Sequence, residues 1–226
     1  MPVRKKAPED LTAKKALALE VIQRLKAEYP DAGCTLDYDH AWQLLVSVRL
    51  AAQCTDARVN IVVEELFAKY PSVAALAAAE PEDIEAIVKP CGLGHSKARD
   101  ISACMRMLRD KYDCRVPNTF EELLALPGVG RKSANLIMGD VFGKPAIVTD
   151  THCIRLCNKI GLVDGIKEPQ KVEMALWKIV PPEEGGDLCH RFVMHGRAVC
   201  NARKPECEKC CLSDICRCAR EEASNV

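Results

Sequence analysis

Lys132 is the residue of this sequence best placed to act as a nucleophile, because it follows the glycine pair Gly128 and Gly130 by two residues. The neutral amine of a lysine attacks electrophilic carbon and forms Schiff bases with carbonyl groups. If Lys132 lies in the first turn of a helix, the positive end of the helix dipole favours that neutral form. A turn followed by a solvated lysine is the plainer interpretation of these residues alone, so the rest of the chain must decide.

The residues around Lys132 predict two helices joined by a glycine hairpin. Pro127 ends the first helix, because proline lacks an amide hydrogen and clashes with the preceding turn. Gly128 and Gly130 then allow a tight turn. Apolar residues with helical spacing resume after the turn, at Ala134, Ile137, Met138 and Val141. The unpaired amide groups at the start of the second helix would suit a phosphate group.

Asp150 is the second residue with candidate chemistry, and it precedes a helix predicted from His152 to Ile160. Aspartate is a favoured N-cap, so a purely structural role is a strong alternative. The two roles are compatible, because a carboxylate that caps a helix is held rigidly.

Two loops elsewhere in the chain carry candidate contact residues, Gln53 and Leu93. Gln53 lies between two predicted helices, the second of which Thr55 or Asp56 can cap, and a solvated loop residue is a sufficient explanation for it. Leu93 stands between two glycines, with the same spacing as in the main hairpin. An exposed apolar tip of this kind either packs on a neighbour or acts as a wedge that opens stacked bases.

Seven of the 14 cysteines lie between Cys189 and Cys218. The chain shows no secretion signal, so this clustering predicts a metal site and not a disulfide scaffold. The pattern is C-x6-C-x2-C-x5-C, formed by Cys200, Cys207, Cys210 and Cys216. Structural zinc is the general expectation for four cysteines, whereas a bulkier four-iron cluster suits the wide outer spacing. Cys211 and Cys218 are near enough to be alternative ligands.

The composition favours an all-α protein, since 48% of the residues are hydrophobic, only 4% are aromatic, and Ala and Leu are abundant. No apolar run is long enough to span a membrane, and the basic first eight residues lack the apolar core of a signal peptide. We therefore expect an intracellular, cytoplasmic protein. Net charge is zero, but Lys89–Arg115 holds seven Lys and Arg against three Asp. Such a basic segment is compatible with a phosphate backbone, although solvated helix faces explain it equally well.

Three motifs together resemble the endonuclease III family of the helix-hairpin-helix superfamily, whose members are DNA glycosylases and abasic-site lyases. They are Leu126-Pro-Gly-Val-Gly-Arg-Lys132, Val148-Thr-Asp-Thr-His152 and the four-cysteine pattern. The resemblance extends from about Ala51 to Cys216 and implies a role for each candidate. It implies that Lys132 and Asp150 are catalytic, that Gly128, Gly130, Gln53, Leu93 and His152 contact DNA, and that Cys200, Cys207, Cys210 and Cys216 hold a [4Fe-4S] cluster.

The resemblance also implies two helical lobes. One is a six-helix lobe at 34–144 that includes the helix-hairpin-helix at about 120–142, and the other joins 1–33 to 145–226 around the cluster. The implied activity is the removal of oxidised pyrimidines, with cleavage 3′ to the abasic site by β-elimination through a lysine Schiff base. The implied partner is double-stranded DNA with a damaged base or an abasic site, bound by a monomer near the nucleoid.

Other functions fit the residues less well. A module that only binds DNA needs neither Lys132 nor Asp150, and an electron-transfer protein needs no glycine hairpin. A related adenine glycosylase usually lacks lysine at this position and carries an added domain, whereas only ten residues follow Cys216 here. Gly94 stands where many relatives have a larger side chain, and the sequence offers no account of the surplus cysteines, among them Cys189, Cys211 and Cys218.

Overall fold

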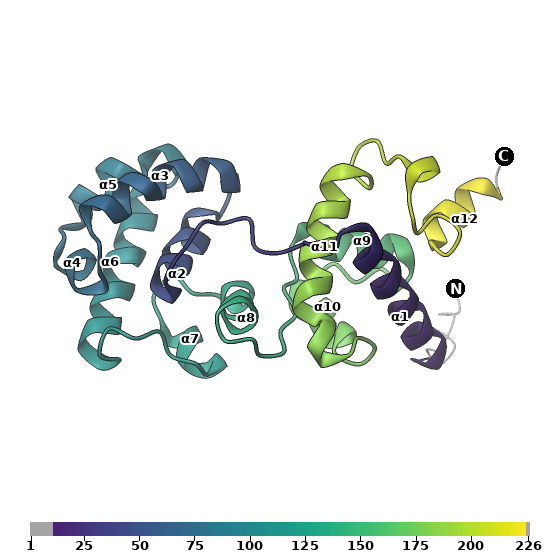
Figure 1. Ribbon diagram of the computed structural model, residues 1–226, viewed down its shortest axis with the longest axis horizontal. Coiled ribbons are helices and arrows are strands. Elements are labelled where there is room, and N and C mark those ends of the chain that lie inside the picture. Colours follow the sequence, from purple (N-terminus) through teal and green to yellow (C-terminus); the bar gives the residue numbers. More distant parts are fainter. Residues whose placement is uncertain (1–10, 225–226) are drawn as a thin grey trace, which may run out of the picture. The chain divides into compact units, whose positions relative to one another are not determined.

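The computed structural model describes residues 11–224, and these residues fold as α-helices joined by turns and short 3-10 segments (Figure 1). The all-helical fold expected from the composition is confirmed, since residues 11–224 contain no strand. None of the helices in this range combines the length and apolar character that crossing a bilayer requires. The chain divides into two compact units, one of residues 34–144 and one of residues 1–33 with 145–226.

The 34–144 unit is built around the long helix α6 (Gly94–Lys111). The other α-helices of the unit are α2 (Ala41–Leu50), α3 (Asp56–Lys69), α4 (Val73–Ala78), α5 (Pro81–Val88), α7 (Phe120–Ala125) and α8 (Arg131–Asp140). Helices α4 and α5 pack along α6, and their aliphatic side chains form one core with those of α2 and α3. The unit contains seven α-helices where six are expected, and two of them, α4 and α7, are only six residues long.

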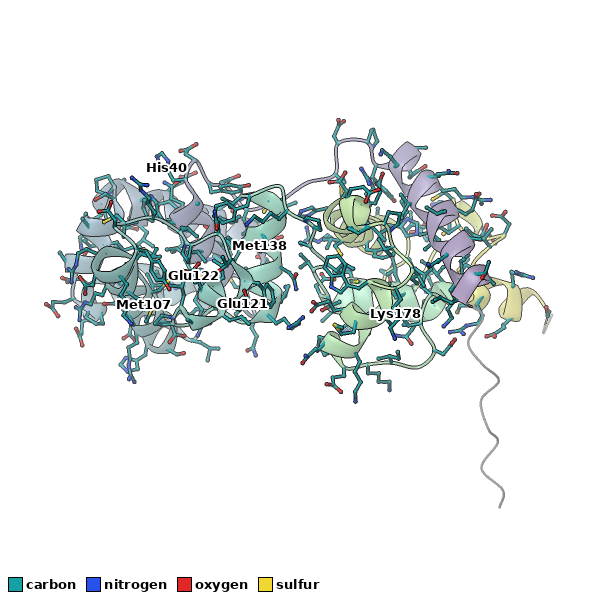
Figure 2. The ribbon with its side chains drawn as sticks, turned by 90° about the horizontal axis from the view of Figure 1, so that it is seen from below. His40, Met107, Glu121, Glu122, Met138 and Lys178 are labelled. Atoms are coloured by element: carbon teal, nitrogen blue, oxygen red, sulfur yellow. The ribbon has the colours of Figure 1, made fainter. Side chains whose placement is uncertain are left out.

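Polar residues begin these helices where the sequence suggests. Thr55, rather than Asp56, is the N-cap of α3, and its hydroxyl accepts the amide of Arg58 at 3.4 Å. Thr119 caps α7 in the same way. Glu121 and Glu122, labelled in Figure 2, lie in the first turn of α7, where acidic side chains are favoured by the helix dipole.

In the second unit, the N-terminal helix α1 packs against a helix from the C-terminal part of the chain. Its helices are α1 (Leu11–Glu28), α9 (Thr151–Ile160), α10 (Pro169–Leu176), α11 (Gly185–Ala198) and α12 (Arg217–Ala223). Helix α11 packs on both α9 and α1, so the two ends of the described chain share one core (Figure 1). Gly185 allows the start of α11 to approach the segment before α9, since a Cβ there would lie 2.5 Å from the carbonyl oxygen of Ala146.

Candidate active site and metal centre

The glycine hairpin runs from the end of α7 at Ala125 to the start of α8 at Arg131. Gly128 has φ +75°, a conformation that glycine adopts without strain. Gly130 is the N-cap of α8, and the first bond of the helix joins Ala134 N to the carbonyl of Gly130 at 2.9 Å. The amides before Ala134 thus precede the helical ladder. Lys132 is the second residue of α8, and its side chain is exposed to solvent beside them.

The glycine hairpin packs against an ion pair between helices α2 and α6. Arg49 of α2 donates from Nε to Asp100 of α6 at 2.7 Å, and from Nη2 to Ser96 Oγ at 3.1 Å. Gly128 lies directly against this pair, since a Cβ on it would be 2.8 Å from Asp100 Cβ and 3.1 Å from Arg49 Cδ. Glycine is therefore required at position 128 for two reasons: the positive φ angle and the lack of room for a Cβ atom.

Gln53 and Leu93 both occupy left-handed backbone conformations, with φ of +58° and +51°. Both side chains are exposed, and 59% of Leu93 is accessible, as expected for an apolar tip. The 3-10 turn η1 (Lys89–Cys91) leads into the Leu93 loop, as α2 leads into the Gln53 loop.

The buried side chain of Lys97 links the Gln53 loop to the Leu93 loop. Its ammonium group is completely buried and donates to the carbonyls of Leu50 and Cys91, each at 2.8 Å. Burial lowers the pKa of Lys97. Lys97 lies in the first turn of α6, which starts at Gly94, and its side chain faces inward.

Asp150 is the N-cap of α9, as its position predicts. Its Oδ1 accepts the amide of Cys153 at 2.7 Å, and the residue is half-buried. His152 follows in the first turn, where its Nδ1 accepts Arg155 Nη2 at 3.2 Å. Gly196 of α11 makes room for this ring, because a Cβ there would lie 2.3 Å from His152 Nδ1.

The four patterned cysteines line one small cavity of about 20 Å³ that is partly open to solvent. Cys218 borders the same cavity, whereas Cys211 does not. Within residues 11–224, no three His, Cys, Asp or Glu side chains converge as the ligands of one metal ion do. Four cysteines on one cavity supply the thiolate donor set that a multi-iron cluster takes.

The surplus cysteine Cys189 has a packing role. It is buried against α9, and its sulfur accepts the amide of Val148 at 3.2 Å, two residues before Asp150. Cys153 and Cys157 are buried in the same region, with their sulfurs 3.9 Å apart. These thiols behave as small apolar side chains beneath the segment that leads to Asp150.

The candidate residues fall into two groups. Gly128, Gly130, Lys132, Gln53 and Leu93 belong to the 34–144 unit, and Asp150, His152 and the four cysteines belong to the other.

Sequence reasoning missed the residues that hold these groups in place, namely Arg49, Lys97, Arg155 and His195. A signal existed for Lys97, because it shares a helical stripe with Ile101, Cys104 and Leu108, all of them buried. The partners of the other three lie far away in the sequence and leave no local pattern.

Comparison with known proteins gives concordant matches. A family model described as HhH-GPD superfamily base excision DNA repair protein matches residues 46–182. Endonuclease III of Synechocystis is 42% identical over 207 residues, which cover 91% of this chain and 94% of that protein. Endonuclease III of Escherichia coli strain K12 is 38% identical over 202 residues, covering 89% and 95%. A solved structure of a trapped endonuclease III–DNA covalent intermediate matches with a TM-score of 0.87 at 38% identity, covering 92% of this chain and 98% of that one.

Proposed function

Since the chain belongs to the helix-hairpin-helix superfamily of base excision DNA repair proteins, and within it to the endonuclease III family, we propose that it removes oxidised pyrimidines from double-stranded DNA. It is a DNA glycosylase and abasic-site lyase. The observation that carries the proposal for its site is the exposed amine of Lys132 in the first turn of α8, directly after the glycine hairpin.

Lys132 is the proposed nucleophile. Its neutral Nζ attacks C1′ of a flipped nucleotide, and the base leaves with the electron pair of the glycosidic bond. The sugar ring opens to a protonated Schiff base, which acts as an electron sink. Loss of a proton from C2′ then places a double bond between C2′ and C3′, and the 3′ phosphate leaves. Water finally hydrolyses the Schiff base and frees Lys132.

Asp150 is the proposed electrostatic partner. Its carboxylate stabilises the positive charge that develops on the sugar as the base departs. The amide of Cys153 holds one carboxylate oxygen at 2.7 Å, so little reorganisation is needed during the reaction.

The proposed DNA contacts divide into two kinds. Amides at the start of α8, after Gly128 and Gly130, hold a phosphate and carry no sequence information. Gln53 and Leu93 enter the duplex, where Gln53 fills the space of the flipped nucleotide and Leu93 wedges the opposite strand. Their exposed side chains on rigid left-handed turns support this assignment, and His152 adds a contact beside Asp150.

Cys200, Cys207, Cys210 and Cys216 are the proposed ligands of a [4Fe-4S] cluster, supported by their shared cavity. Such a cluster supplies a one-electron redox centre and a covalent anchor for a loop with little regular structure. The residues of this chain between the ligands include Arg203, Lys204 and Lys209, all exposed and suited to DNA phosphates. Purified protein should absorb near 400 nm and contain four irons per chain, whereas colourless protein with stoichiometric zinc would contradict the assignment.

Borohydride trapping tests the proposed chemistry. A duplex with one abasic site is mixed with the protein and borohydride, and a covalent adduct is sought on a denaturing gel. We expect an adduct with wild type and with Lys111→Ala, an exposed lysine of α6, but none with Lys132→Ala. Duplexes with thymine glycol, uracil or a thymine mispair, compared under the same conditions, then test the choice of lesion. DNA binding without any adduct would indicate a glycosylase that uses water and no lysine.

A further inference from the structure

The side chains of Tyr29, His195 and Cys210 form a continuous row of hydrogen bonds, and Cys210 is one of the four proposed cluster ligands. The Tyr29 hydroxyl lies 3.1 Å from His195 Nδ1, and His195 Nε2 lies 3.3 Å from Cys210 Sγ. Tyr29 follows α1, His195 belongs to α11, and Cys210 belongs to the proposed cluster loop. Only 1% of His195, the middle residue of the row, is exposed, whereas Tyr29 and Cys210 are half-buried.

The direction of these hydrogen bonds follows from the chemistry of the groups. A thiolate bound to iron offers only lone pairs, so the hydrogen between Cys210 and His195 must be on Nε2. In a neutral ring the other nitrogen, Nδ1, then carries a lone pair and accepts the hydroxyl of Tyr29. Tyr29 thereby fixes the tautomer that His195 needs to donate to the sulfur.

The surroundings hold this geometry in place. The rings of Tyr29 and His195 meet edge to face, with centroids 5.8 Å apart and planes at 70°. Arg191, one turn before His195, donates from Nε to the carbonyl of Tyr29 at 3.4 Å. The backbone carbonyl of His195 accepts the amides of Val199 and Cys200, at 3.0 and 2.8 Å, so the backbone that carries the ring is also tied to the start of the loop.

Cys210 and Cys216 differ in the groups that face their sulfur atoms. Cys210 faces His195 and also the amide of Leu212, at 3.4 Å. The sulfur of Cys216, in contrast, lies 3.4 Å from the carbonyl oxygen of Lys159, which cannot donate. The protein thus places two N–H groups, from His195 and Leu212, against the sulfur of Cys210.

We infer that the Tyr29–His195 pair is a tuning device for the cluster, raising its reduction potential and slowing its loss through a hydrogen bond to Cys210. The inference rests on the proposed [4Fe-4S] cofactor. A hydrogen bond to a ligand sulfur stabilises the more negative, reduced state, and its effect is larger in a buried site.

The test is a spectroelectrochemical titration of the purified holoprotein without DNA, followed by the rate at which a chelator removes iron. His195→Phe should lower the midpoint potential and release iron several-fold faster. His195→Gln should restore most of both, because its amide NH₂ reaches about the same point as Nε2. Tyr29→Phe keeps the ring and removes only the hydroxyl, so it should shift the potential in the same direction by less.

Tyr112→Phe, in the other unit, is the matched control and should equal wild type. If these variants retain the cluster at an unchanged potential, the pair is only structural and the inference is wrong. If His195→Phe does not fold, the Tyr29→Phe potential decides alone. A wild-type protein without iron would overturn the cofactor and the inference together, whereas iron with unchanged potentials overturns only the inference.

Discussion

Arg155 donates from Nη2 to the carbonyl oxygen of Cys200 at 2.7 Å, and this bond joins helix α9 to the first of the four loop cysteines. The same nitrogen lies 3.2 Å from the carbonyl of Gly196 and 3.2 Å from His152 Nδ1. One guanidinium therefore fastens the helix capped by Asp150, the end of α11 and the start of the cysteine loop.

Replacing Arg155 by Met should loosen this junction. The carbonyls of Gly196 and Cys200 lose a charged donor, so we expect the free energy of unfolding to fall by about 1.5–3 kcal/mol and iron to be released faster. Urea unfolding and an iron assay with a chelator measure the two effects. Arg220→Met, on the exposed side of α12, is the control and should change neither. Unchanged iron release in Arg155→Met would show that the loop holds its shape without α9.

Gly128→Ala should destabilise the 34–144 unit. The substitution forces a side chain into a left-handed conformation and drives a Cβ to 2.8 Å from Asp100 Cβ, which together cost about 1–3 kcal/mol. At Gly130 φ is −97° and no atom lies within 4 Å of an added Cβ, so Ala there should cost clearly less. Chemical denaturation of both variants checks the order, and equal losses would contradict it.

Lys97→Met should also destabilise that unit, although it removes a buried charge. The carbonyls of Leu50 and Cys91 remain buried without their donor, at a cost of about 1–3 kcal/mol. Lys111→Met on the exposed face of the same helix should be neutral. We also expect Lys97→Met to weaken binding to an abasic duplex, since it frees the loops of Gln53 and Leu93. Wild-type stability of Lys97→Met would indicate that water replaces the ammonium group.

The two roles of Asp150 are separable by substitution. Asp150→Asn retains an oxygen that accepts the amide of Cys153, so stability should change little while base removal slows by about 100-fold or more. Asp150→Ala should lose a further contribution of about 1 kcal/mol because the cap is gone. Single-turnover excision and thermal unfolding measure the two quantities. Full activity in Asp150→Asn would reduce this residue to a cap.

Asp164 should contribute an acid-sensitive part of the stability. Lys14, 2.7 Å away, and Arg217 hold its pKa below the usual 3.8. The folded pKa is lowered, so the contribution is complete above about pH 5 and is lost as the pH falls through the folded pKa. A third of the side chain is exposed, so the effect is about 1 kcal/mol or less. The stability difference between wild type and Asp164→Asn should thus be constant around pH 7 and shrink as the pH falls below about 4, and a difference independent of pH would contradict this account.

The fold followed from the sequence wherever local signals sufficed. Pro81 and Thr119 mark the starts of α5 and α7, and Asp150 marks that of α9. Helix α6 begins at Gly94, before its apolar stripe, because Leu93 adopts a left-handed conformation that no propensity scale anticipates. Helix α12 lies in a tail whose cysteine spacing gave no helical period.

The candidate site was predictable only as a set of motifs. Lys132 and Asp150 stand in recognisable local patterns, and their roles remain predictions. The residues that fix them act across long stretches of chain, as Arg49 does toward Asp100 and Arg155 toward Cys200. Such pairs arise from tertiary packing, and a single sequence contains no local trace of them.

The way in which the two units divide the chain sets the order in which its parts can fold during synthesis. Residues 34–144 are continuous and are able to fold as soon as they leave the ribosome, whereas α1 emerges earlier and must wait for α11. Its apolar residues Val21, Ile22 and Leu25 have no native partner until then. Tyr29 and His195 are 166 residues apart in the sequence. The apolar face of α1 is therefore exposed in the nascent chain until translation is nearly complete. We therefore expect the proposed cluster to be inserted late, after the cysteine loop has left the ribosome.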